Sequence, residues 1–183
     1  MARTFFFWIA IALILFSFLF PVFWVYVTSL KSGEDIFSTG MFFTPTFENY
    51  KYVLEVKPSL VELTNSILIS VISTFFVILV SVPAAYSFAR FNTGGGHLLF
   101  ITISTRMFPG VVAAIPFFIA FKELGLLDTH IGLTLMYVYF NMSFATFLLY
   151  GFFKEIPVAL EHAAMLDGYN RLDIIRKIIL ELV

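Results

Sequence analysis

The sequence of 183 residues contains no cysteine and few charges. Disulfides, iron–sulfur clusters and a cysteine nucleophile are therefore excluded. The three histidines, His97, His130 and His162, lie too far apart for the spacing of metal ligands, so no metal site is expected. The formal net charge is −1 and the basic residues are scattered, so nucleic acid is not an expected partner.

Motifs for catalysis and nucleotide binding are also missing. The phosphate-binding pattern G-x-x-x-x-G-K-[ST] does not occur, and "TGGGH" at 93–97 lacks its lysine, so the chain is not expected to hydrolyse ATP by itself. No H-E-x-x-H or G-x-S-x-G occurs. The long apolar segments offer serines and threonines, but no histidine or carboxylate that would act as a base at depth. We expect no enzyme, no catalytic residue and no cofactor.

Apolar residues are abundant: 60% of the chain is hydrophobic and 25 residues are Phe. This composition places the chain in the membrane class. About 20 apolar residues cross a bilayer as a helix, and four segments are long enough, at about 5–30, 63–88, 98–121 and 131–153. The first lacks a signal-peptide cleavage site, so it is expected to be an uncleaved span, kinked at Pro21. The predicted fold is an all-α, polytopic transmembrane helical bundle with four spans.

The spans define the domain organisation. We expect an N-terminal segment and first span at 1–30, an extracytoplasmic loop at 31–62, a core with three spans at 63–155, and a cytoplasmic segment at 156–183. Lys and Arg set the orientation of a multi-pass protein, because they are enriched on the cytoplasmic side. With a cytoplasmic N-terminus, that side holds Arg3, Arg90, Lys154, Arg171, Arg176 and Lys177. The other side holds fewer basic residues, diluted by carboxylates, which favours this orientation.

Arg106 is the most informative residue within the spans. It lies about 12 Å into the bilayer by helical rise, and all twelve carboxylates lie outside the spans. Its expected partners are backbone carbonyls, polar groups such as Asn141, water or another chain. Pro109 and Pro116 follow it and are expected to break the span twice, as in helices that line a transport pathway. The alternatives are an arginine that extends to the headgroups, an ordinary proline kink, and an Asn141 that bonds a neighbouring helix.

The polar segment "PVALEHAAMLDGYN" follows the last span. Pro157 suits the first turn of a helix, the helix is expected over 158–166, and Gly168 suits the left-handed turn that ends it. A second helix is expected from Arg171 to Val183, with Leu172, Ile175, Ile179 and Leu182 on one stripe. We call residues 156–183 the elbow. The alternative is an amphipathic helix lying on the membrane surface.

Within the elbow, "EHAAMLDG" resembles the EAA motif of the permease subunits of ABC importers. Further segments resemble the carbohydrate-type branch of that family in the same order along nearly the whole chain: "PVFWVYVTSLK" (21–31), "PTFENYKYVL" (45–54), "AAYSFARF" (84–91), "TRMFP" (105–109) and "FKELGLLDTHIGL" (121–133). The resemblance implies a type I importer permease fold in a bacterial or archaeal cell membrane. It also implies two further spans after the elbow, which this sequence does not contain, so we expect a permease represented in part.

The resemblance implies a transport function with separate partners. These are an ATPase subunit dimer, a second permease subunit, an extracytoplasmic substrate-binding protein and the lipid bilayer. The chain would move a sugar or polyol-like solute by alternating access, coupled to ATP hydrolysis in the ATPase subunit. The implied coupling residues are Glu161, Ala163, Ala164, Asp167 and Gly168, and the pathway or interface residues expected from the spans are Arg106, Pro109 and Asn141. The alternatives are a permease fragment that transports nothing and a small self-contained channel.

Overall fold

The computed structural model describes residues 2–33, 35–57, 59–107 and 110–183. These residues form helices joined by turns and loops, and none of them lies in a strand. The chain divides into two compact units, the first ending at Thr64 and the second running from Asn65 to Val183. Helix α3, Ser59–Phe91, runs across the boundary between them.

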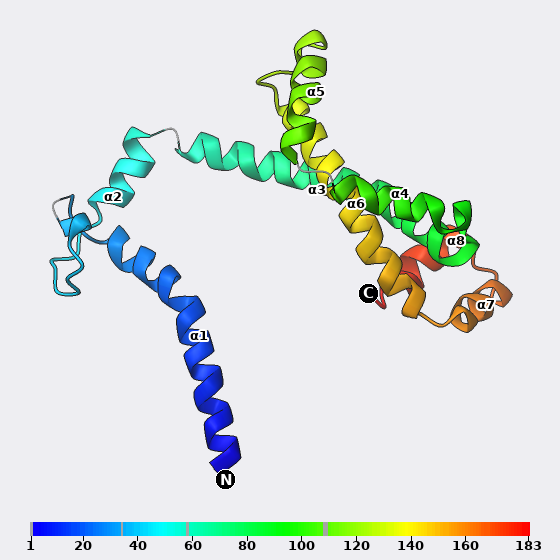
Figure 1. Ribbon diagram of the computed structural model, residues 1–183, viewed down its shortest axis with the longest axis horizontal. Coiled ribbons are helices and arrows are strands. Elements are labelled where there is room, and N and C mark those ends of the chain that lie inside the picture. The colour runs from blue at the N-terminus through cyan, green and yellow to red at the C-terminus, as the bar shows by residue number, and fades with distance from the viewer. Residues whose placement is uncertain (1, 34, 58, 108–109) are drawn as a thin grey trace. The chain divides into compact units, whose positions relative to one another are not determined.

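The first unit is dominated by helix α1, Ala2–Ser29, which continues without a break through Pro21 (Figure 1). A 3₁₀ turn follows at Asp35–Phe37. The short helix α2, Glu48–Lys51, then continues into a π-helical turn at Tyr52–Val56. Apolar side chains cover α1 all round and are mostly exposed in the isolated chain, as expected of a helix that faces lipid.

The loop after α1 is organised around a buried lysine. The Lys31 side chain is fully buried, and its Nζ donates hydrogen bonds to the carbonyl oxygens of Ser38 at 2.7 Å and Gly40 at 2.8 Å. The same ammonium lies 5.2 Å from the ring centroid of Trp24 and 5.4 Å from that of Phe43. A buried charge needs such partners, so the loop carbonyls and aromatic faces together compensate for the lost hydration of Lys31.

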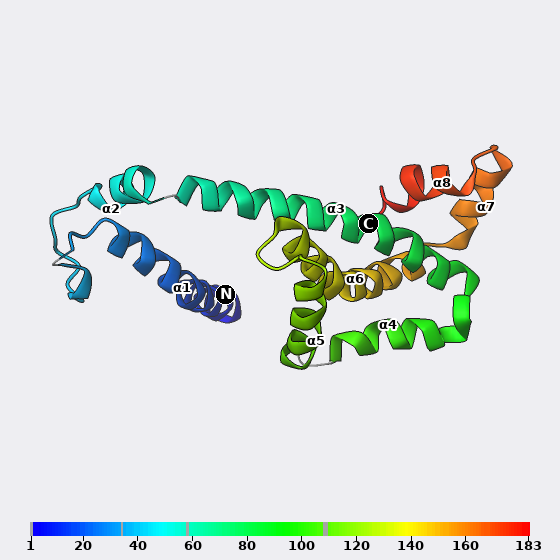
Figure 2. The same cartoon turned by 90° about the horizontal axis from the view of Figure 1, so that it is seen from above.

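The second unit begins with the C-terminal part of α3 and folds back on itself (Figure 2). Asn92, with a φ of 47°, and a 3₁₀ turn at Thr93–Gly96 reverse the chain after α3. The next helices are α4, His97–Met107, α5, Gly110–Glu123, and α6, His130–Glu155. A hydroxyl group joins α3 to α6: Ser81 of α3 donates a hydrogen bond to the Met142 carbonyl of α6 at 3.1 Å. Such hydrogen bonds are a common way for membrane helices to associate.

Among the described residues, three helices are long and apolar enough to cross a membrane, namely α1, α3 and α6. Helices α4 and α5 form a fourth candidate together, but they are bent by 91° and make either a broken span or a re-entrant segment. The predicted break at Pro116 is wrong. Pro116 lies inside α5, which continues through it, and Pro109 lies outside the described residues.

The elbow folds into helix α7, Val158–Leu166, helix α8, Arg171–Ile174, and a π-helical turn at Ile175–Ile179. Figures 1 and 2 both show it beside the C-terminal end of α3 and the end of α6. The core of the second unit lies here and gathers residues from α3, α6 and the elbow. Its members are Val82, Ala85, Tyr86, Phe153, Ile156, Ala164, Ile174, Ile175 and Ile179.

The second helix of the elbow differs from its prediction. Ile175 and Ile179 of the predicted stripe are buried and Ile174 joins them, but Leu172 is 71% exposed, Leu182 is 57% exposed, and the helical turn ends at Ile179 rather than at Val183. The reason is the π-helical turn, whose wider i→i+5 spacing rotates the buried face relative to that of a regular α-helix. Leu172 therefore lies on the exposed side of the elbow, away from the core.

Candidate functional site

The turn between α7 and α8 is closed by backbone hydrogen bonds around Gly168. Its φ of +87° lies in the left-handed region that favours glycine. The Gly168 N–H donates to the Met165 carbonyl at 3.1 Å, and the Tyr169 N–H donates to the Ala164 carbonyl at 3.0 Å. These bonds satisfy carbonyls that the end of α7 would otherwise leave unpaired. The turn therefore fixes the direction in which α8 leaves α7.

Glu161, in the first turn of α7, is fully buried and bonded through both carboxylate oxygens. Its Oε2 accepts a hydrogen bond from the Tyr86 hydroxyl at 2.6 Å, and its Oε1 accepts one from Arg90 Nε. Arg90 also donates from Nη2 to the Ile156 carbonyl at 3.0 Å. Because the Arg90 side chain is only 6% exposed, this is a desolvated ion pair completed by additional hydrogen bonds.

Arg171 of α8 adds a second positive charge to the same carboxylate. Its Nη1 donates to the Tyr86 hydroxyl at 3.1 Å and lies 3.9 Å from Glu161 Oε2. Its guanidinium lies 5.2 Å from the ring centroid of Phe91. The Arg171 side chain is 49% exposed, so solvent screens it far more than Arg90. We call Tyr86, Arg90, Glu161 and Arg171 the anchor network.

The five coupling residues expected from the sequence therefore lie on two different sides of the elbow. Glu161 and Ala164 are buried against α3 and the core, and the small Ala164 side chain allows that close packing. Ala163, Asp167 and Gly168 are exposed. Leu166, between Ala163 and Asp167, is 90% exposed and does not belong to the core cluster. The outer face of α7 is thus an open surface that carries the small Ala163 and the apolar Leu166 beside the polar side chains of His162 and Asp167.

Sequence reasoning missed Tyr86, Arg90, Arg171 and Leu166 as site residues. From the sequence, Arg90 contributes only to the charge bias that sets the topology. A usable signal was present in "AAYSFARF", where Tyr86 and Arg90 stand four residues apart and thus share a helix face at the end of a span. Nothing in the sequence indicated that Glu161, 71 residues later, would meet them.

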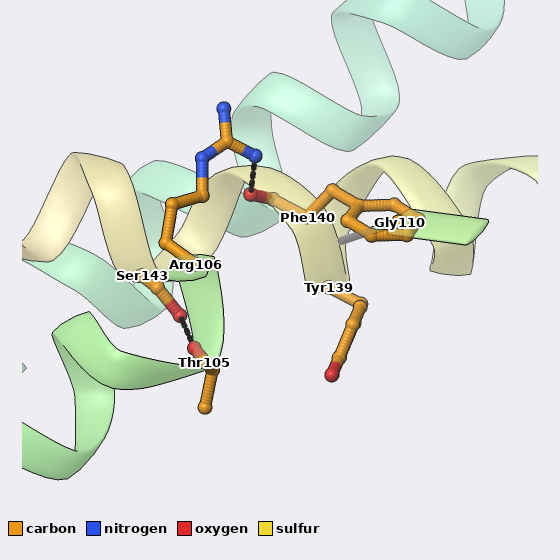
Figure 3. Close-up of a pocket in the computed structure, with 6 residues that line it drawn as sticks. All are labelled: Thr105, Arg106, Gly110, Tyr139, Phe140 and Ser143. Atoms are coloured by element: carbon orange, nitrogen blue, oxygen red, sulfur yellow. Dashed lines mark hydrogen bonds between the residues drawn. The ribbon is translucent and has the colours of Figure 1, made fainter. Parts of the chain in front are cut away.

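A second feature is a cavity of about 200 Å³ between α4, α5 and α6. Arg106 lines it and donates from Nη1 to the Phe140 carbonyl at 2.7 Å (Figure 3). Thr105 and Ser143 share a hydrogen bond of 2.7 Å at its edge. The remaining lining residues are Gly110, Tyr139 and Phe140. The cavity combines a guanidinium, hydroxyl groups and aromatic rings within an apolar helical unit.

Among the described residues, Asn141 does not line this cavity. Asn141 donates from its side chain to the Tyr137 carbonyl of its own helix at 2.8 Å, so it does not contact Arg106 through that amide. Pro109 lies outside the described residues. The backbone carbonyl of Phe140 is one of the partner types that the sequence predicted for Arg106.

These helices and their apolar lengths define the class: a multi-pass, all-α membrane protein. No protein-family model matches the chain. The chain is 34% identical, over 97% of its length, to the probable ABC transporter permease protein y4oR of Sinorhizobium fredii. It is 34% identical, over 95%, to the sulfoquinovosyl glycerol transport system permease protein SmoH of Agrobacterium fabrum, and 35% identical, over 90%, to the trehalose transport system permease protein SugB of Mycobacterium tuberculosis.

The chain belongs to the family of ABC transporter permeases, as the resemblance in its motifs predicted. It covers 64%, 62% and 61% of the lengths of these three relatives, which is less than two thirds of each.

Proposed function

We propose that the chain is a permease subunit of an ATP-binding cassette importer, without catalytic activity of its own. It moves a sugar or polyol-like solute across the cell membrane by alternating access, coupled to ATP hydrolysis in a separate ATPase dimer. A second permease subunit and an extracytoplasmic substrate-binding protein complete the assembly. Family membership supports this proposal, as do relatives named for sulfoquinovosyl glycerol, trehalose and diacetylchitobiose transport.

In the proposed topology the N-terminus and the elbow face the cytoplasm. Residues 1–30 and 63–155 supply the spans, residues 31–62 form an extracytoplasmic loop, and residues 156–183 form the coupling segment. The observation that carries the coupling role is the two-sided character of α7. Its inner face is held by the anchor network and the core, whereas Ala163, Leu166 and Asp167 are open. We propose that this outer face docks on the ATPase subunit.

Replacing Leu166 with Asp tests the docking surface. Leu166 is 90% exposed, so the charge should leave the fold of the chain intact while placing a carboxylate in an apolar contact. We expect the ATPase subunit to be lost when the chain is purified by an affinity tag. The matched control is Leu182→Asp, at an exposed leucine on the C-terminal turn, which should keep the ATPase.

The proposed docking surface is wrong if Leu166→Asp purifies with as much ATPase as the unchanged chain does. If the unchanged chain binds no ATPase at all, the importer function itself is contradicted. In that case, ion conductance of the chain alone in planar bilayers would favour the channel alternative, and its absence would favour the fragment.

We further propose that the cavity lined by Arg106 belongs to the solute pathway. Its guanidinium and hydroxyl groups suit a hydroxyl-rich solute, and its aromatic rings suit the apolar face of a sugar ring. Arg106→Gln should lower ATP-driven uptake by about 10-fold or more, because a charged hydrogen-bond donor is lost from the pathway. A panel of radiolabelled sugars that includes trehalose and diacetylchitobiose measures this in proteoliposomes.

Lys122→Gln is the control for the Arg106 substitution, because it removes a charge from the exposed end of α5. It should leave uptake unchanged. Normal uptake by Arg106→Gln, in complexes of normal subunit composition, would remove the cavity from the pathway.

A further inference from the structure

A single carboxylate joins the elbow to the end of a long apolar helix. Glu161 lies in the first turn of α7, and both of its oxygens are used by residues in the last two turns of α3. Tyr86 takes one oxygen and Arg90 the other. A carboxylate held at both oxygens by two donors resists rotation as well as displacement, so α7 is fixed in orientation relative to α3.

Arg90 holds two parts of the elbow at once. Its Nε bonds Glu161 in α7, and its Nη2 bonds the carbonyl of Ile156, just before the N-cap residue Pro157. The planar guanidinium sets the angle between these two bonds, which a lysine at the same position would not do. Both the start of α7 and the segment leading into it are therefore attached to one side chain of α3.

Apolar packing lies directly beside these bonds. Ala164, one turn after Glu161, is 4% exposed and belongs to the same core cluster as Val82 and Ala85 of α3. Close-packed contacts of this kind deform little and transmit displacement. The outer face of α7 makes none of these contacts, so one short helix carries an open surface on one side and a rigid attachment on the other.

We infer that Tyr86, Arg90 and Glu161 are positioning residues through which a displacement of α7 is passed to α3. None of them touches the ATPase in this scheme, and Glu161 in particular acts inside the chain. The inference rests on the proposed docking of α7 on an ATPase subunit. Such coupling requires a structural element that can adopt two arrangements, and in this scheme that element is α3 together with the attached elbow.

The absence of cysteine permits a test with two fluorescent reporters. Ala159→Cys, exposed on α7, carries an environment-sensitive bimane label that reports on the docked helix. Val80→Cys, 45% exposed and about 15 Å before Arg90 along α3, carries the same label in a second preparation. The assembled transporter is purified with its partners, and emission is compared without nucleotide and after trapping with ATP and orthovanadate. Background labelling is measured in a preparation whose chain carries neither cysteine substitution.

In the otherwise unchanged chain, both labels should respond to trapping. With Arg90→Gln, the label at position 159 should still respond to trapping. The response of the label at position 80 should fall by roughly 2- to 30-fold, which is the range of coupling effects for residues that lie between two sites. Tyr86→Phe, which removes only a hydroxyl, serves as a milder variant and should lower the Val80 response in the same direction. Arg176→Gln, the same substitution at an exposed arginine outside the anchor network, should change neither response.

The inference is overturned if the Val80 response survives in both Arg90→Gln and Tyr86→Phe. It is also overturned if neither label responds to trapping in these variants, because the network would then support docking of α7 rather than pass its displacement to α3. A different result contradicts the proposed function instead: no response of the Ala159 label to ATP and vanadate in the unchanged chain.

Discussion

Glu161→Ala should lower the stability of the second unit by about 3 to 5 kcal/mol, because it leaves the buried guanidinium of Arg90 without its carboxylate. It also removes the acceptor of the Tyr86 hydroxyl. The measurement is the temperature at which half of the detergent-solubilised protein loses its monodisperse peak in size-exclusion chromatography. Yields from the membrane should fall in parallel.

Two further variants make this expectation specific. Asp173→Ala removes a carboxylate from the exposed pair with Lys177 at 3.3 Å and should cost no more than about 1 kcal/mol. Arg90→Met combined with Glu161→Leu removes both buried charges and should recover much of the loss seen in Glu161→Ala. A double variant as unstable as Glu161→Ala would mean that the loss comes from packing around α7 rather than from an uncompensated charge.

Gly132→Ala is expected to disrupt the start of α6. A Cβ at residue 132 would lie 2.2 Å from the carbonyl oxygen of Leu126, and backbone has little freedom to move away. The same site holds the N-cap of α6, where Thr129 Oγ1 accepts a hydrogen bond from the Gly132 N–H at 3.0 Å. Overpacking together with the loss of this cap should cost about 3 kcal/mol in the same thermal assay.

The matched control lies in the same helix. Gly151 has nothing within 4 Å of its Cβ position, so Gly151→Ala should be neutral or should stabilise α6 by about 1 kcal/mol, the difference in helix propensity. Equal stability of the two variants would contradict the steric reason given for Gly132.

Local patterns were enough to predict much of the helical structure. The helix at 158–166 and the left-handed glycine after it follow from a proline, a run of helix formers and Gly168, all within a few residues. The apolar segments were equally clear, because length and composition alone define a candidate span. The bend between α4 and α5 was not predicted in this form, since Pro116 was expected to break a helix that in fact continues through it.

The burial of two charged side chains, Glu161 and Lys31, was not predicted. The burial of Glu161 requires Tyr86 and Arg90, which come from a different helix. The burial of Lys31 depends on the carbonyl oxygens of Ser38 and Gly40, 7 and 9 residues away in an irregular loop that helix and span patterns do not describe. Charge and periodicity predict that a residue is polar or faces outward, but tertiary structure decides which polar residues are buried together. The division of the coupling residues between an inner and an outer face of α7 follows from that tertiary contact.

The separation of 71 residues between Arg90 and Glu161 also sets an order of events during synthesis. Arg90 lies in the last turn of α3, and the chain must then produce α4, α5 and α6 before α7 supplies the carboxylate. The loop around Lys31, by contrast, closes over only 7 to 9 residues. Local contacts form early and distant ones late, so the Arg90–Glu161 pair is a late step in the biogenesis of the second unit. Until then, Arg90 near the end of α3 lacks the carboxylate that compensates its charge in the folded unit.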